Sequence, residues 1–120
     1  MSELSGYMYS LVSVPLYDTL GATAIEFIVN QTEMEVIIAS ADKAITLLDM
    51  ISVLPTVKTI IVMGELDPQL VAQGAALNIQ VHAWTNIERS GLEKPVSPNP
   101  PKADDVASIC YTSGTTGTPK

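Results

Sequence analysis

The apolar residues of this 120-residue chain fall into short runs that alternate between two patterns. Compact apolar runs predict strands, whereas apolar residues at every third or fourth position predict helices. Strands are therefore expected at 11–17, 36–39, 59–63, 79–84 and 106–111, and helices at about 22–32, 40–54, 68–78 and 85–91. This alternation indicates an α/β fold, a partial doubly wound and mostly parallel sheet with flanking helices.

Polar residues mark the expected helix ends. Ser40 or Asp42 can cap the helix that follows the strand at 36–39, and Asp67 followed by proline is a favourable helix start. Thr85–Glu88 has the spacing of a capping box. Asn78 is suited to a left-handed cap at the end of its helix.

Two of the expected strands carry further information. Thr59–Met63 is almost wholly apolar, a pattern typical of a parallel strand that is covered on both faces. The strand at 106–111 follows a segment, 92–105, that holds four of the eight prolines. We interpret this segment as an extended connector that delivers the last strand.

The ten residues Tyr111–Lys120 comprise the last residue of the expected strand and the polar segment that follows it. Gly114 and Gly117 permit positive φ, so successive backbone N–H groups can point toward one anion. The Ser and Thr hydroxyls add donors, and Lys120 adds a positive charge. Two residues separate the glycines and Pro119 precedes the lysine, so the spacing is not that of a Walker A loop. The composition suits polyphosphate.

Composition and charge exclude several other classes of function. The net charge of −7 provides no basic surface for nucleic acid or anionic lipid. Cys110 lies in an expected apolar strand, which favours a buried, unreactive thiol in a reducing compartment. His82 is the single histidine, so no metal cluster is expected around it. No apolar run in the sequence is long enough to span a bilayer.

All ten positions of Tyr111–Lys120 resemble the signature phosphate loop of the adenylate-forming superfamily, which includes acyl-CoA synthetases, aryl-CoA ligases and peptide-synthetase adenylation domains. Ser13–Gly21, Ile25–Glu33 and Leu54–Met63 resemble long-chain fatty acyl-CoA synthetases, particularly the eukaryotic type. The resemblance implies that residues 1–120 are an incomplete piece of an AMP-binding N-terminal domain. Within it, 92–105 is the connector and 106–120 is a strand plus the phosphate loop.

What the resemblance implies is an ATP-dependent long-chain fatty acid–CoA ligase of fatty acid metabolism. In such enzymes a fatty carboxylate attacks the α-phosphate of ATP that is bound to Mg²⁺. The thiol of coenzyme A then displaces AMP. The matching loop holds the β- and γ-phosphates by positioning and electrostatics. The location in the cell that the resemblance implies is the cytoplasmic face of the endoplasmic reticulum, a peroxisome or a lipid droplet. The implied ATP contacts are Thr112, Ser113, Gly114, Thr115, Thr116, Gly117 and Lys120.

In the family the acyl tunnel, the adenine and metal sites and the catalytic lysine all follow this loop. No catalytic or metal-binding residue is therefore expected in the chain, and we expect no ligase activity from the 120 residues alone. The alternatives are a piece of an aryl-CoA ligase or peptide-synthetase domain, a non-catalytic phosphate-binding module, or a fragment that pairs its sheet edge with a full-length synthetase. In each case the incomplete sheet should expose apolar surface and favour aggregation.

Overall fold

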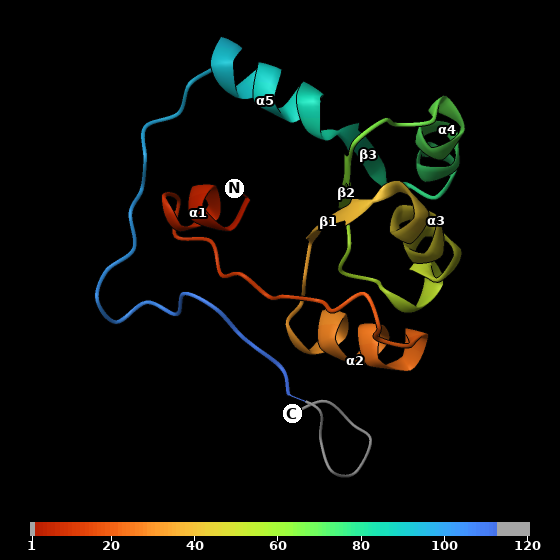
Figure 1. Ribbon diagram of the computed structural model, residues 1–120, viewed down its shortest axis with the longest axis horizontal. Helices are drawn as coiled ribbons and strands as arrows, with labels where there is room; N and C mark the ends of the chain where they lie inside the picture. Colours follow the sequence, from red (N-terminus) through yellow and green to blue (C-terminus); the bar gives the residue numbers. More distant parts are fainter. Residues whose placement is uncertain (1, 113–120) are drawn as a thin grey trace.

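The computed structural model describes residues 2–112, and these form a three-stranded parallel sheet with flanking helices (Figure 1). The α/β class predicted from the sequence is therefore confirmed. The described elements, in chain order, are α1 (Ser2–Tyr7), α2 (Ala22–Gln31), β1 (Val36–Ser40), α3 (Ala41–Asp49), the short 3-10 helix η1 (Ile51–Val53), β2 (Thr59–Met63), α4 (Pro68–Ala76), β3 (Gln80–Ala83) and α5 (Trp84–Glu93).

The sheet has the order β1-β2-β3, with α3 and α4 as its two crossover helices. Val36 of β1 is paired with Thr59 of β2, which is paired in turn with Gln80 of β3. Both crossover helices lie on the same side of the sheet (Figure 1). The inward residues of the strands and helices form one apolar core there: Ile37, Ala39, Ala44, Leu47, Leu48, Ile60, Val62, Leu70 and Val81 are all buried.

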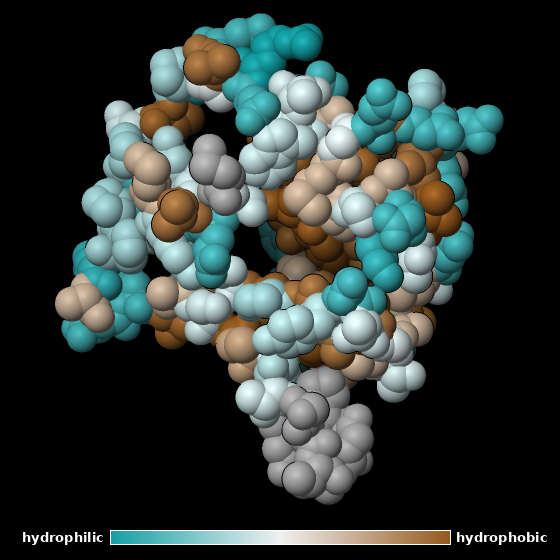
Figure 2. Space-filling model, viewed as in Figure 1, coloured by the Kyte–Doolittle hydropathy of each residue, from teal (hydrophilic) through white to brown (hydrophobic). Residues whose placement is uncertain are grey.

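Only one face of the sheet is fully buried, which corrects the expectation that β2 is covered on both faces. Burial alternates along β1 and β2, as it does in a strand whose side chains point to opposite faces. On the second face Val36 is 50% exposed, Ile38 38% and Met63 51%. Figure 2 shows hydrophobic surface near the middle of the molecule, around the position of β1 and β2 in Figure 1. The predicted exposure of apolar surface is confirmed.

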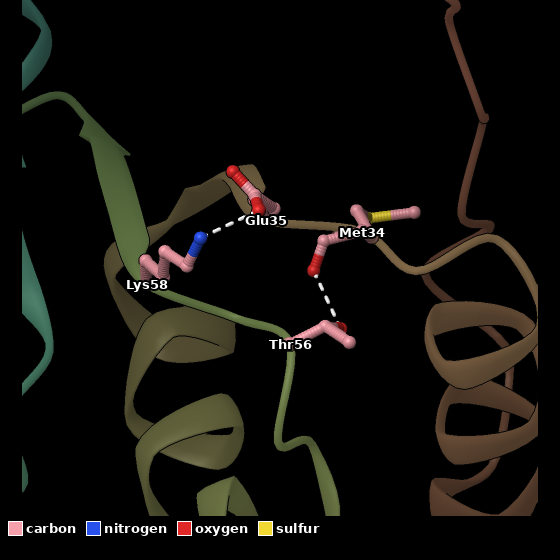
Figure 3. Close-up of polar contacts among 4 residues, drawn as sticks. All are labelled: Met34, Glu35, Thr56 and Lys58. Carbon is pink, nitrogen blue, oxygen red and sulfur yellow. Dashed lines mark hydrogen bonds and ion pairs between the residues drawn. The ribbon is translucent and has the colours of Figure 1, made fainter.

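The amino-terminal ends of β1 and β2 are joined by side chains as well as by the backbone (Figure 3). The Lys58 ammonium lies 2.6 Å from a Glu35 carboxylate oxygen, and the Thr56 hydroxyl donates to the Met34 carbonyl at 2.9 Å. The Lys58 N–H also donates to the Glu35 carbonyl at 2.9 Å. Because the ion pair is well exposed, the backbone bonds contribute more to the register than the charges do.

The helix ends of α4 agree with the sequence prediction. The Asp67 carboxylate accepts a hydrogen bond from the Gln69 N–H at 2.8 Å, as an N-cap should. Asn78 has a φ of 59°, and the Ile79 N–H donates to the Gly74 carbonyl at 2.8 Å. This is the hydrogen bond expected beyond a left-handed cap.

Two other predicted caps are wrong. Ser40 stands at the N-cap of α3, but its hydroxyl donates to the Asp42 carboxylate at 2.5 Å and no side-chain cap forms. Thr85 does not begin a capping box, since α5 already starts at Trp84, directly after β3. The same helix continues to Glu93, past the expected end near Gly91.

The strands expected at 11–17 and 106–111 are reduced to a single parallel bridge between Ser13 and Ser108. The Ser13 N–H donates to the Ala107 carbonyl at 3.0 Å, and the Ile109 N–H donates to the Ser13 carbonyl at 2.9 Å. Strands need neighbours on which to form a ladder, and this pair has none among the described residues. Cys110 is consequently exposed, not buried as predicted.

Residues 94–105 contain no helix or strand, whereas Leu92 and Glu93 belong to α5. Ser2–Tyr7 forms α1, a helix that is not among those expected from the sequence. No helix among the described residues is long and apolar enough to cross a membrane.

Candidate functional site

The predicted phosphate contacts divide between described and undescribed residues. Thr112 is described and exposed. The other predicted contacts lie outside the described residues: Ser113, Gly114, Thr115, Thr116, Gly117 and Lys120. What the structure shows of this site is therefore the part of the chain that leads into the loop.

Tyr111, the residue before Thr112, is attached to α2. Its hydroxyl donates to the Gln31 side-chain oxygen at 2.7 Å. Its ring meets Phe27 edge to face, with ring centroids 6.4 Å apart and planes at 84°. Phe27 and Gln31 are one helical turn apart on α2 and so lie on the same side of that helix. The hydrogen bond connects residues 80 positions apart in sequence.

The segment before Tyr111 runs beside the amino-terminal part of the chain. The Ser13–Ser108 bridge joins the two segments, and the Tyr17 hydroxyl lies 3.8 Å from the Cys110 sulfur. The thiol beside it raises the pKa of Tyr17 above its ordinary value. The two segments therefore lie side by side at these positions.

The connector is held by the residues that follow α1. The Asn99 N–H donates to the Met8 carbonyl at 2.9 Å, and the Ser10 hydroxyl donates to the Asn99 carbonyl at 2.7 Å. The Tyr9 hydroxyl donates to the Val96 carbonyl at 2.9 Å. These contacts fix the path along which the chain returns from α5 toward α2 (Figure 1).

A groove of about 1000 Å³ lies elsewhere, at the carboxyl ends of β2 and β3. Gly64 and Glu65 line it after β2, Val71 lines it from α4, and Trp84 lines it at the start of α5. Open α/β sheets bind ligands at this edge, so the sequence could have indicated the position from the residues that follow the predicted strands. The charged residue in its lining is the acidic Glu65, which makes the groove unsuited to phosphate.

Among the described residues, no group of three or more His, Cys, Asp or Glu side chains could hold a metal ion. The described residues next to the predicted phosphate loop are Tyr111, Phe27 and Gln31, which contact one another.

Comparison with known proteins shows the family of this chain and the solved structures that share its fold. The family described as "AMP-binding enzyme" matches residues 1–120, so the chain belongs to the AMP-binding enzyme family. The fold agrees: an adenylation domain of a carboxylate reductase from Mycobacterium chelonae superimposes with a TM-score of 0.79 at 27% identity, over 98% of this chain and 20% of that one. A carboxylic acid reductase domain from Segniliparus rugosus, solved with AMP and a carboxylic acid, gives 0.81 at 23% identity, over 98% and 21% of the two chains.

Similar sequences within this family include long-chain fatty acid–CoA ligases. The peroxisomal long chain acyl-CoA synthetase 6 of Arabidopsis thaliana is 45% identical over 93% of this chain and 16% of its own. The long-chain-fatty-acid–CoA ligase 5 of Mus musculus is 42% identical over 100% of this chain and 18% of its own. The chain thus spans less than a fifth of the length of these relatives.

Proposed function

We propose that this chain supplies the ATP phosphate loop of a long-chain fatty acid–CoA ligase. The observation that carries the proposal is the polar segment Tyr111–Lys120 in a chain of the AMP-binding family that is 42–45% identical to such ligases. The proposed contacts to the β- and γ-phosphates are those expected from the sequence: Thr112, Ser113, Gly114, Thr115, Thr116, Gly117 and Lys120.

The chemistry assigned to these residues is binding and orientation. Two glycines allow the backbone N–H groups to approach the phosphates, the hydroxyls donate to phosphate oxygens, and Lys120 balances charge that develops on pyrophosphate. Mg²⁺ neutralises part of the same charge when ATP is bound, and coenzyme A accepts the acyl group in the parent reaction. The residues of this chain hold the leaving group in line for attack by the carboxylate.

We assign no complete ligase activity to the 120 residues. The relatives named as ligases or synthetases are more than five times as long as this chain. Purified chain incubated with MgATP, palmitate and coenzyme A is expected to form neither palmitoyl-AMP nor palmitoyl-CoA. Formation of either product above a no-enzyme control would overturn this part of the proposal.

Selectivity among phosphates tests the role of the loop. Because the proposed contacts are to the β- and γ-phosphates, MgATP and magnesium pyrophosphate should both bind, and AMP should bind more weakly than either. Calorimetric titration with the three ligands measures this order directly. Stronger binding of AMP than of pyrophosphate would mean that the loop does not hold the terminal phosphates.

A further inference from the structure

The helix that contacts Tyr111 is firmly attached to the rest of the fold. Ile28 and Val29 of α2 are fully buried, and Val29 is part of the main apolar core. The Asn30 amide donates to the Val53 carbonyl at 2.9 Å, which ties α2 to η1. A side chain that binds the outer side of α2 is therefore held in a fixed position relative to the core.

Residues 106–111, the segment that ends at Tyr111, make little regular secondary structure. Between Val106 and Tyr111 the described structure has one isolated bridge, and residues 106–110 are exposed. Tyr111 by contrast is half-buried, with both its ring and its hydroxyl engaged by α2. Its side chain thus fixes the point from which the chain continues into Thr112 and the phosphate loop.

We propose that Tyr111, Gln31 and Phe27 form an anchor that positions the start of the phosphate loop. The proposal rests on the proposed function, because it assigns to these three residues the preorganisation of that same site. A loop that starts from a fixed point loses less conformational freedom when its donors converge on an anion. The three are positioning residues, since their described contacts are with one another.

Hydrogen exchange of the apo chain tests the anchor without any ligand. Tyr111→Phe removes the hydroxyl and Gln31→Met removes its acceptor, and each is expected to raise deuterium uptake in peptides covering 108–120 while leaving β1, β2 and β3 unchanged. Gln31→Glu keeps an acceptor and should behave as wild type. Tyr9→Phe is the matched control, because its hydroxyl is bonded to the connector at Val96. Unchanged uptake in both Tyr111→Phe and Gln31→Met would overturn the proposal.

Titration of the same variants with magnesium pyrophosphate shows whether the anchor serves binding. Loss of one hydrogen bond predicts about three- to tenfold weaker affinity for each single variant. The double variant should be no weaker than either single one, because both remove the same contact. Additive losses would contradict a shared anchor. If wild type binds no pyrophosphate, the proposed function fails, and the exchange experiment still decides the anchor.

Discussion

At the scale of single residues, Asp67 and Ser40 show what decides whether a polar side chain caps a helix. Asp67 precedes a proline, its backbone is extended, and its carboxylate can only accept, so it takes the Gln69 N–H. Ser40 has similar backbone angles, but its hydroxyl can also donate and does so to Asp42. Neighbouring acceptors therefore decide the role of a serine at such a position.

The Asp67 cap should be measurable in stability. Asp67→Ala leaves the first N–H groups of α4 without this acceptor, so the free energy of unfolding should fall by about 1 kcal/mol. Asp67→Ser retains an acceptor and should lose much less. Urea denaturation followed by circular dichroism provides both values. Equal stability of wild type and Asp67→Ala would show that the cap contributes nothing.

The hydrogen bond from the Ser40 hydroxyl should have a measurable effect on the pKa of Asp42. Its hydrogen bond lowers the pKa of Asp42 below the ordinary value of an aspartate, about 3.9. A lowered pKa contributes stability above the unfolded value, and this is lost as pH falls through the folded value. Ser40→Ala should therefore raise the pKa of Asp42, as followed by NMR of its carboxyl carbon. An unchanged or lower pKa would argue against this cause.

At the scale of elements, the contact between α4 and β3 depends on a glycine. A Cβ added at Gly74 would lie 2.4 Å from the Val81 methyl carbon Cγ2 and 2.9 Å from the Ile79 carbonyl oxygen. The second neighbour is backbone and cannot rotate away. The close approach of this helix to its strand thus requires the absence of a side chain at Gly74.

A pair of matched substitutions tests this packing. Gly74→Ala is expected to lower the free energy of unfolding by about 1–3 kcal/mol, in spite of the higher helix propensity of alanine. Gly91→Ala in α5 meets nothing within 4 Å and should be neutral or stabilising by up to about 1 kcal/mol. Thermal and urea unfolding of both variants give the comparison. Stabilisation by both would mean that α4 and β3 are less closely packed than described.

Elements with local signals were predictable, and elements that depend on distant partners were not. β2 has the predicted bounds because Thr59–Met63 is a dense apolar run, and α4 begins after the predicted Asp67 cap. The prediction of a strand at 106–111 was wrong, because the composition of a segment does not show whether neighbouring strands are present to pair with it. The contact of Tyr111 with Gln31 was missed for the same reason, since no local pattern relates two residues so far apart.

At the scale of the whole molecule, the described fold is open. The chain exposes 8154 Å², whereas a compact monomer of 12.8 kDa is expected to expose about 6300 Å². Part of the excess lies on the second face of the sheet, where Ile38 and Met63 are exposed. An open apolar face of this kind predicts aggregation of the purified chain, to be checked by light scattering against concentration.

Adjacent isoleucines distinguish the two faces. Ile37 is 5% exposed and Ile38 is 38% exposed, on opposite sides of β1. Ile37→Thr should cost about 2 kcal/mol or more of unfolding free energy, and Ile38→Thr should cost much less and reduce aggregation. Urea unfolding and light scattering separate the two effects. Similar losses at both positions would indicate that the second face is also covered.

The central role proposed for this chain is phosphate binding by the Tyr111–Lys120 segment. The most direct measurement is calorimetric titration of the chain with MgATP, for wild type, Thr116→Ala and the control Thr85→Ala in α5. We predict saturable binding that weakens several-fold in Thr116→Ala and is unchanged in Thr85→Ala, because only the first removes a proposed phosphate donor. Absence of binding, or equal binding by all three proteins, would contradict the assignment of this segment as an ATP phosphate loop.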